Sequence, residues 1–290
     1  MEKVLSGVLN IYKPLGITSN GVVTRVRRLT GIKKVGHTGT LDPEAEGVLP
    51  ICIGKATKVA GMLTDADKAY RATIKLGVTT DSQDMTGNIL TSHKADVTRE
   101  QFEEVLSSFV GKVSQIPPMY SAIKMNGQPL YKLARKGVEV ERKPRVITIS
   151  EINLLDFLGD EAVFEVFCSK GTYIRTLCAD IGEKLGMGAA MKALVRIKSG
   201  PFCAEKSVKL EELEKHPEKI EQLLISPDSL FDYHELMVDT KQMEKIKSGI
   251  RIRYEKAENG LKYKVYGPAG EFLCISEGKD GELIMVQSFY

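Results

Sequence analysis

A carboxylate on a sharply bent loop is the first group in this 290-residue chain that could do chemistry. Asp42 stands directly before Pro43, and residues 36–47 also contain His37 and three glycines. A residue before proline is pushed out of helical geometry, and glycine lets a bulky ligand approach the backbone. The loop therefore presents one acid on a rigid support, which suits a reacting group. The alternative is an ordinary turn in which Asp42 caps a local amide.

The apolar pattern predicts the strands and helices that must position this loop. Residues 48–53 form a strand-like run directly after it. Thr18 or Ser19 can cap a helix, and a capping box at 98–101 starts another. Because strands and helices mix without a regular βαβ rhythm, we expect an α/β (α+β) fold with a mixed, mainly antiparallel sheet. Further strands are expected at 7–12, 71–78 (opened by Tyr70), 146–155 and 161–168, and helices at 55–62, 130–136, 173–185 and 208–224.

The pattern changes at about Met237. From there on, short apolar runs are separated by glycine and proline, as at Gly267-Pro268 and Gly278. Such spacing is typical of a small β-rich module. We therefore divide the chain into a first domain, residues 1–234, and a β-rich C-terminal domain, residues 235–290.

Basic and acidic residues are unevenly distributed, although the net charge is only +3. Lys and Arg outnumber Asp and Glu nine to four in residues 1–60, seven to two in 119–149 and eight to three in 240–266. In residues 205–235 the ratio is reversed, at four to nine. This alternation suits a protein with an RNA face and a solvent face, and ordinary surface charge is the alternative.

Cysteines, histidines and apolar runs narrow the class of protein. The five cysteines are scattered and include no Cys-x-x-Cys pair, which is typical of small core residues in a reducing compartment. The histidines are dispersed without a metal-ligand pattern. The N-terminal residues lack a signal-peptide pattern, and no apolar run approaches the length of a membrane span. We therefore expect a cytoplasmic protein without a metal site.

Five sequence blocks, in a fixed order and without a long gap, resemble the TruB family of pseudouridine synthases. Two stretches depart from the family pattern: Asn20-Gly21 replaces a different polar pair, and residues 193–196 are looser than the usual arginine-rich version. The second departure would alter RNA contacts. The blocks are NIYKP at 10–14 with Gly16 and Thr18-Ser19, GHTGTLDP at 36–43, YRA at 70–72 with Leu76-Gly77 and Thr80-Asp81, QIPPMYSA at 115–122 and SKGTYIR at 169–175.

The resemblance implies an activity, a fold and a partner. The family isomerises uridine 55 in the T loop of tRNA, a reaction that uses no cofactor and no metal. The implied architecture is the pseudouridine synthase fold, a large curved sheet with a central cleft, followed by a PUA-like RNA-binding domain. The expected partner is the T-arm stem-loop of tRNA. No membrane and no obligatory protein partner are expected, and the chain should act as a monomer.

Three residues match the chemistry of the family. Asp42 matches the nucleophile that acts at ribose C1′, and both the covalent (acylal) and the glycal route stay open. Arg175 matches the arginine that pairs with this carboxylate. Tyr70 matches the tyrosine that stacks on the flipped base and can serve in proton transfer. On the pattern alone, Arg175 would be a structural ion pair and Tyr70 a core residue.

Four further residues match RNA contacts of the family. Tyr173 and Leu194 align with residues that line the uracil pocket, whereas the bare pattern would assign both to packing. His37 matches the residue that takes up space in the distorted T loop, and a solvated loop histidine is the alternative. Lys13 would brace the active-site loop or contact phosphate, and a solvated surface lysine is the alternative.

Two other functions stay open at this point. A guide-RNA-dependent relative that works inside a ribonucleoprotein shares the Asp motif, but it normally carries long basic extensions, whereas this sequence ends at Tyr290. A non-catalytic RNA-binding or RNA-folding protein would have no need for Asp42, Tyr70 and Arg175 together. A folding role could nevertheless coexist with catalysis.

Overall fold

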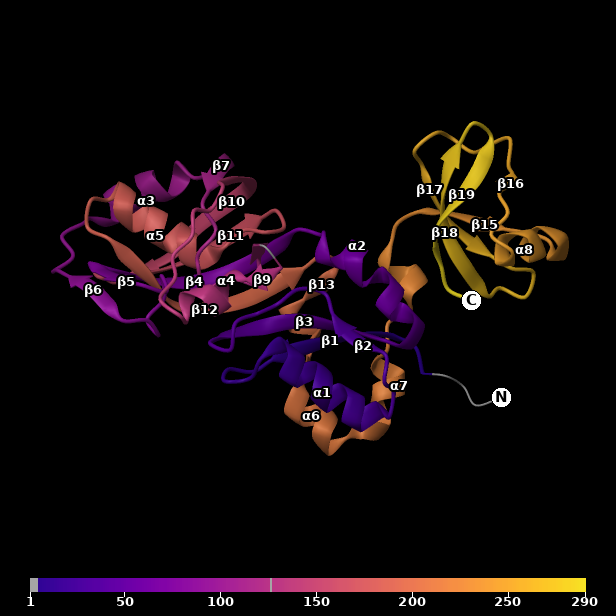
Figure 1. Ribbon diagram of the computed structural model, residues 1–290, viewed down its shortest axis with the longest axis horizontal. Coiled ribbons are helices and arrows are strands. Elements are labelled where there is room, and N and C mark those ends of the chain that lie inside the picture. Colours follow the sequence, from indigo (N-terminus) through magenta and orange to yellow (C-terminus); the bar gives the residue numbers. More distant parts are fainter. Residues whose placement is uncertain (1–4, 126) are drawn as a thin grey trace.

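In residues 5–125 and 127–290, which the computed structural model describes, ten strands form one mixed sheet (Figure 1). Residues 1–4, on which the expectation about a signal peptide partly rests, lie outside the described residues. Two strand pairs, β1 with β14 and β3 with β12, are parallel, and the other pairs are antiparallel. The predicted α/β class with a large, mainly antiparallel sheet is therefore confirmed. The strand order is β14 (Val208–Lys209), β1 (Gly7–Lys13), β3 (Ala45–Ile53), β12 (Ala189–Ser199), β4 (Lys68–Leu76), β11 (Glu161–Cys168), β10 (Arg145–Phe157) and β7 (Gly111–Gln115), with β2 (Val35–His37) on β3 and β13 (Phe202–Cys203) on β12.

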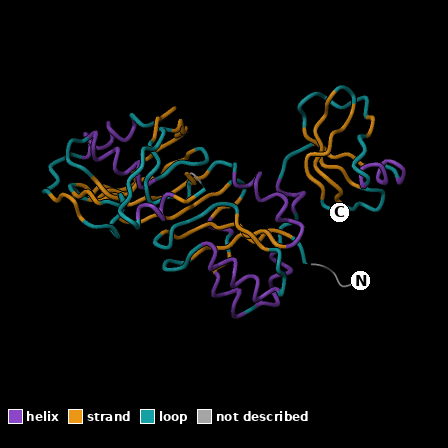
Figure 2. Tube along the Cα trace, viewed as in Figure 1, coloured by secondary structure: helices purple, strands orange, loops and turns teal. Residues whose placement is uncertain are grey.

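Helices cover the sheet in two groups (Figure 2). Helices α3 (Arg99–Ser107) and α5 (Ile174–Lys184) pack on β4, β10, β11 and β12, where Phe102 and Phe164 are fully buried in a shared core. Helices α1 (Ser19–Thr30), α6 (Leu210–Lys215) and α7 (Ile220–Leu223) pack on β1 and β3 around Val22 and Ile51. The parallel pairing of β3 with β12 joins the parts of the sheet that carry these two cores.

Local sequence signals predicted several elements correctly. The Thr18 hydroxyl accepts a hydrogen bond from Gly21 N and caps α1, which ends at Gly31 with a positive φ of 70°. The capping box of Thr98 and Gln101 starts α3 with both of its hydrogen bonds formed. Strands β10 and β11, both predicted, pair antiparallel with each other. The thiols are free and buried, apart from the half-buried Cys203.

Three predicted elements between residues 54 and 136 differ in extent from the observed ones. The helix predicted at 55–62 is a 3-10 turn, η1 (Gly54–Val59), followed by the short helix α2 (Ala60–Thr64). Tyr70 does not open its strand, because Lys68 and Ala69 already pair with β11. That strand ends at Leu76, since Gly77 adopts a φ of +77°, and β5 (Val78–Thr80) then pairs with β6 (Ile89–Ser92). Of the helix predicted at 130–136, only α4 (Leu130–Ala134) forms.

The predicted helix at 208–224 is interrupted. Its first two residues form β14, and the helical part is divided by His216, whose backbone leaves helical geometry before Pro217. Proline fits the first turn of a helix but not its interior, so the chain starts a new 3-10 turn there. The segment consequently folds back over β1 instead of extending as one rod.

A second sheet forms the C-terminal domain, in agreement with the predicted β-rich module. It starts at His234, next to the expected boundary, and includes helix α8 (Thr240–Lys247), which the pattern did not predict. Ile275 and Phe289 from this sheet pack into one apolar cluster with Val8 and Val48 of the first domain. The two domains therefore share a core. The strand order is β15 (His234–Met237), β17 (Lys262–Tyr266), β18 (Phe272–Lys279), β19 (Glu282–Ser288) and β16 (Ile252–Arg253).

Candidate active site

The Asp42 loop connects β2 to β3 and borders a cleft of about 770 Å³. Hydrogen bonds hold the backbone on both sides of Asp42. The Ser19 hydroxyl accepts from Leu41 N at 2.8 Å and donates to Leu41 O at 3.1 Å, while Gly16 N donates to Pro43 O at 2.9 Å. Because its neighbours are fixed in this way, the Asp42 side chain projects into the cleft, where it is 47% exposed. A rigid backbone with a reachable carboxylate is the arrangement predicted from the sequence.

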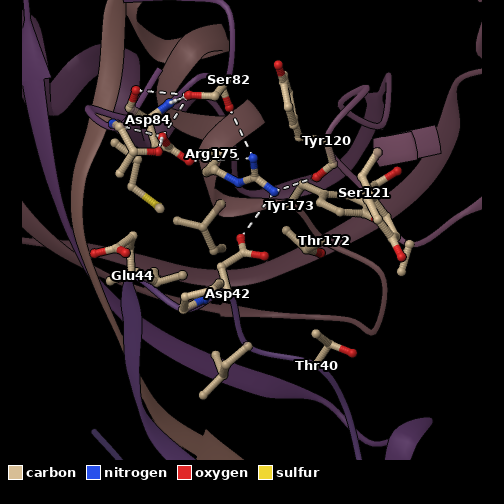
Figure 3. A pocket seen from close by; sticks show the side chains of 18 of the residues that line it. Thr40, Asp42, Glu44, Ser82, Asp84, Tyr120, Ser121, Thr172, Tyr173 and Arg175 are labelled. Carbon is tan, nitrogen blue, oxygen red and sulfur yellow. Dashed lines mark hydrogen bonds and ion pairs between the residues drawn. The ribbon is translucent and has the colours of Figure 1, made fainter. Parts of the chain in front are cut away.

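Arg175 faces Asp42 from the first turn of α5 (Figure 3). Its Nη2 lies 3.1 Å from Asp42 Oδ2 and donates to Tyr120 O at 2.7 Å. Its Nη1 donates to Ser82 O at 3.1 Å and lies 3.5 Å from Asp84 Oδ2. Arg175 is only 6% exposed, so these partners fix the plane of its guanidinium and aim one edge at the Asp42 carboxylate.

The walls of the cleft bring three more predicted residues to the same site. Tyr70 from β4, Leu194 from β12 and Tyr173 before α5 all line it. Tyr173 is held by a two-way backbone contact with the buried Gln115 side chain, at 2.8 Å and 3.1 Å. Burial raises the pKa of both tyrosines, so each hydroxyl is favoured in its protonated form. The structure thus assembles an acid, an arginine and two aromatic rings from distant segments.

This cleft offers no metal-binding cluster. Nowhere in residues 5–125 and 127–290 do three His, Cys, Asp or Glu side chains meet in a way that could hold a metal ion. Among the described helices, none has the length and apolar character needed to cross a lipid bilayer.

Comparison with known proteins assigns the chain to a family. The model described as TruB family pseudouridylate synthase (N terminal domain) matches residues 27–174, and the model described as tRNA pseudouridylate synthase B C-terminal domain matches residues 175–232. The tRNA pseudouridine synthase B of Clostridium perfringens (strain SM101 / Type A) is 46% identical over 281 residues, 94% of this chain and 95% of that protein. The chain belongs to the TruB family. A second relative of the same name, from Azoarcus sp. (strain BH72), is 46% identical and covers 97% of this chain and 94% of its own length.

Solved structures carry the same fold as this TruB family member. The structure described as a Cbf5-Nop10-Gar1 complex has a TM-score of 0.74 at 25% identity and covers 98% of this chain and 85% of its own. The structure of an H/ACA RNP bound to a substrate RNA containing 2'-deoxyuridine has the same TM-score at 23% identity, over the same shares of both chains. The pseudouridine synthase fold expected from the sequence is confirmed.

Lys13 and His37 take positions that narrow their expected roles. Lys13 is fully buried, and its Nζ donates to the carbonyls of Ile17 at 2.7 Å, Pro14 at 2.9 Å and Pro43 at 3.3 Å. The expectation of a phosphate contact is therefore wrong for Lys13, because its ammonium is enclosed and braces the loop. Burial also lowers the pKa of Lys13 to about 8. His37, at the end of β2, accepts a hydrogen bond from Gly39 N at 3.3 Å, and its RNA contact stays a prediction.

Sequence reasoning missed two residues of this TruB site. Asp84 pairs with Arg175 from the far side, and its Oδ1 accepts from Ser82 Oγ at 2.7 Å and from Thr86 N at 3.0 Å. Arg196 lies under the cleft at 1% exposure and donates to Val48 O at 2.7 Å. Asp84 has the signature of a turn aspartate, and Arg196 lies in β12, a strand that the sequence pattern did not predict. Only the assembled fold reveals the partners of either side chain.

Proposed function

We propose that this chain converts uridine to pseudouridine at position 55 in the T loop of tRNA, acting alone in the cytoplasm. The observation that carries the proposal is the Asp42–Arg175 pair, at 3.1 Å in a cleft lined by Tyr70. A reachable carboxylate beside a fixed guanidinium is what attack at a sugar carbon requires. The family membership and the names of the curated relatives support the same reaction.

The chemistry is an isomerisation with a simple balance. The bond from ribose C1′ to uracil N1 breaks, and a bond from C1′ to C5 forms. One proton leaves C5 and one is gained at N1, so no electrons are exchanged with a second substrate. Asp42 either attacks C1′ or assists glycal formation, and in both routes its negative charge is required close to the sugar. Arg175 holds the carboxylate in position for that step.

The cleft can also hold the detached base while it turns. Tyr70 supplies a ring face for stacking, and Tyr173 and Leu194 supply apolar contact on other walls. The target uridine must first leave the stacked T loop, which costs a few kcal/mol that stacking and phosphate contacts offset. Basic side chains in segments 1–60, 119–149 and 240–266 would bind the tRNA backbone. The C-terminal sheet would serve as a PUA-like RNA-binding domain.

An unmodified tRNA transcript tests the proposal directly. The purified chain, in excess EDTA and without guide RNA or protein partner, should form pseudouridine at position 55 and at no other uridine. An isolated T-arm stem-loop should also react, since RNA loops are recognised by local shape. A requirement for a guide RNA would favour the ribonucleoprotein alternative. Tight T-arm binding without pseudouridine would favour the RNA-binding alternative.

A further inference from the structure

Arg196 is a buried cation without an acidic partner. Its Nε donates to Val48 O at 2.7 Å, Nη2 to Gly39 O at 3.2 Å and Nη1 to Thr40 O at 3.5 Å. In the part of the chain that the structure describes, no carboxylate lies within 4.0 Å of its nitrogens. A dry charge is normally paired, because its desolvation is costly. An arginine that spends its hydrogen bonds on neutral carbonyls keeps its positive charge available to another group.

The strand register places Tyr70 beside this charge. Arg196 on β12 is the direct cross-strand partner of Tyr70 on β4, so the two side chains leave the sheet on the same face. On its other side Arg196 is paired with Gly47 of β3. A Cβ at Gly47 would lie 2.3 Å from Arg196 O, so glycine is needed for β3 to approach this closely. The Arg196 guanidinium therefore lies between the strand that carries Tyr70 and the loop that carries Asp42.

The charged and titratable groups around the pair come from several elements. Cys168 on β11 and Asp42 on its loop face Tyr70, and both raise the pKa of its hydroxyl. Burial is the largest effect and also raises the pKa of Tyr70, whereas the positive charge of Arg196 lowers this pKa. Arg196 is in turn approached by the cations Lys13 on β1 and Lys68 on β4, and by His37 on β2, whose pKa is lowered by burial and by Arg196. Arg196 is thus the positive group that most directly opposes the burial of Tyr70.

We propose that Arg196 is a positioning residue that acts through Tyr70, orienting its hydroxyl and stabilising the negative charge that its oxygen carries during proton transfer. The proposal rests on the proposed isomerisation, in which C5 loses a proton and N1 gains one. If the Tyr70 oxygen accepts the C5 proton, it is negative before that transfer, and the C5–H electron pair returns to the ring. If it donates a proton to N1, it is negative afterwards. In either order a fixed guanidinium lowers the energy of the charged oxygen.

Single-turnover kinetics with tRNA test the effect on catalysis. Arg196→Met and Arg196→Gln remove the charge, and we expect the rate of pseudouridine formation to fall about 10²-fold. Arg196→Lys keeps the charge but not the planar fork, and it should recover part of that loss. Arg71→Met is the matched control, because Arg71 follows Tyr70 on β4 but pairs with Glu165 at 2.7 Å on the other side of the sheet. It should keep the wild-type rate. All variants should bind tRNA as wild type does, since Arg196 is enclosed.

A double-mutant cycle separates action through Tyr70 from bracing of the Asp42 loop. In a Tyr70→Phe background, Arg196→Met should cause no more than about a twofold further loss, because the hydroxyl that it serves is gone. An equal loss in both backgrounds would overturn the proposal. The proposal would also be overturned if the Arg196 variants lost thermal stability or tRNA binding while the single-turnover rate of their folded fraction stayed unchanged.

A spectroscopic measurement needs no activity. With ¹³Cζ-labelled tyrosine, the Tyr70 resonance is identified by its loss in Tyr70→Phe. At pH 8 we expect the Tyr70 chemical shift in Arg196→Met to differ from that in wild type, and its titration should begin at higher pH. The chemical shift and the titration of Tyr70 in Arg196→Lys should lie between those of Arg196→Met and wild type. Identical Tyr70 resonances and titrations in wild type and Arg196→Met would refute the coupling. If wild type formed no pseudouridine, the proposed function would fail, while this measurement would still decide whether Arg196 acts on Tyr70.

Discussion

The cleft and the C-terminal sheet both carry basic side chains, but they hold them in opposite ways. Lys13, Arg175 and Arg196 in and beneath the cleft are at most 6% exposed, and main-chain carbonyls fix their nitrogens. In the C-terminal domain, the Arg251 and Arg253 side chains are 63% and 80% exposed and pair with surface glutamates. The first group is preorganised and dry, whereas the second is solvated and screened by salt.

This contrast separates chemistry from affinity. A fixed, buried charge at the cleft acts on one reacting atom, and its removal should lower turnover while tRNA affinity is kept. An exposed charge acts on the phosphate backbone as a whole, so its removal should weaken binding while turnover is kept. Substitutions in the two regions should therefore give opposite patterns of turnover and dissociation constant.

Asp42→Asn should have the largest effect on turnover. The amide keeps the shape of the side chain but removes the nucleophilic charge beside Arg175, so we expect single-turnover rates to fall by about 10⁴- to 10⁶-fold. The dissociation constant for tRNA should change little, because phosphates and loop shape determine binding. Glu44→Gln, two residues away, removes an equal charge and should retain turnover of the wild-type order. Near-normal turnover in Asp42→Asn would mean that Asp42 is not the nucleophile.

Tyr70 separates stacking from proton transfer. Tyr70→Phe keeps the ring and removes the hydroxyl, and we expect turnover to fall by about 10²- to 10⁴-fold if that hydroxyl moves a proton. Tyr70→Leu removes both functions and should be at least as impaired. An active Phe variant with an inactive Leu variant would show that the ring only stacks. Both variants should be compared at saturating enzyme, so that binding does not enter the rate.

Asp84→Asn should lower turnover by a smaller factor. Asp84 also lines the cleft, but its side chain is less exposed than that of Asp42, and it holds the far edge of Arg175 at 3.5 Å. Loss of this charge should let the guanidinium tilt, and we expect a decrease of about 10-fold to 100-fold. Asp81→Asn is the control, because Asp81 lies in the same loop but bonds to Asn88 at 2.9 Å. Equal losses in both variants would point to the loop as a whole and not to the contact with Arg175.

How much of the site could be predicted depended on whether a signal was local. The Asp42 loop, the N-cap of α1 and the capping box of α3 are written in adjacent residues, so the sequence alone identified them. The helix α8 carries a signal of the same kind, a capping box from Asp239 to Gln242, and could have been found in the same way. Pairing of Asp42 with Arg175 came from family resemblance, since no local pattern links residues so far apart.

Register and packing explain what stayed hidden. Arg196 is buried because its strand lies between β3 and β4, and an alternating pattern cannot tell which neighbours a strand will have. Lys13 is enclosed for a similar reason, since its three carbonyl partners come from a turn and from the Asp42 loop. The strand β3 starts at Ala45, earlier than predicted, because Glu46 and Gly47 pair with β12. Such facts exist only once the sheet is assembled.

Lys13→Met should lower stability more than chemistry. The substitution removes an enclosed ammonium and its hydrogen bonds to the carbonyls of Pro14 and Ile17, while Pro43 O keeps only its bond from Gly16 N; this should cost about 2 kcal/mol of unfolding free energy. Urea denaturation measures this change, with the exposed Lys33→Met as control.

The pKa of Lys13 falls from 10.5 to about 8 on folding, so the unfolded chain binds more protons than the folded chain between these two pH values. Stability of wild type relative to Lys13→Met should therefore rise from pH 8 to 10.5. A constant difference over that range would contradict the assignment.

The exposed lysines of α8 should have the smallest effect on chemistry and the clearest effect on salt dependence. Deleting the C-terminal domain would expose the apolar cluster around Phe289, so charge substitutions are the cleaner test. The triple variant Lys241→Gln, Lys245→Gln and Lys247→Gln should reduce the slope of log K against log salt by about one for each phosphate that these lysines neutralise in the wild type. Turnover at saturating tRNA should stay within about twofold of wild type, because turnover at saturation does not report binding.

A second triple variant makes this comparison decisive. Lys206→Gln, Lys215→Gln and Lys219→Gln remove the same net charge from exposed positions in the acidic segment 205–235. If the α8 lysines contact the tRNA backbone, only the first variant should flatten the salt slope. Equal slopes in both variants would mean that net charge steers the tRNA and that the C-terminal sheet makes no phosphate contacts through α8. A loss of turnover in the α8 variant would contradict the division between buried charges that act on chemistry and exposed charges that act on tRNA affinity. An exposed charge far from Asp42 would then act on the chemistry.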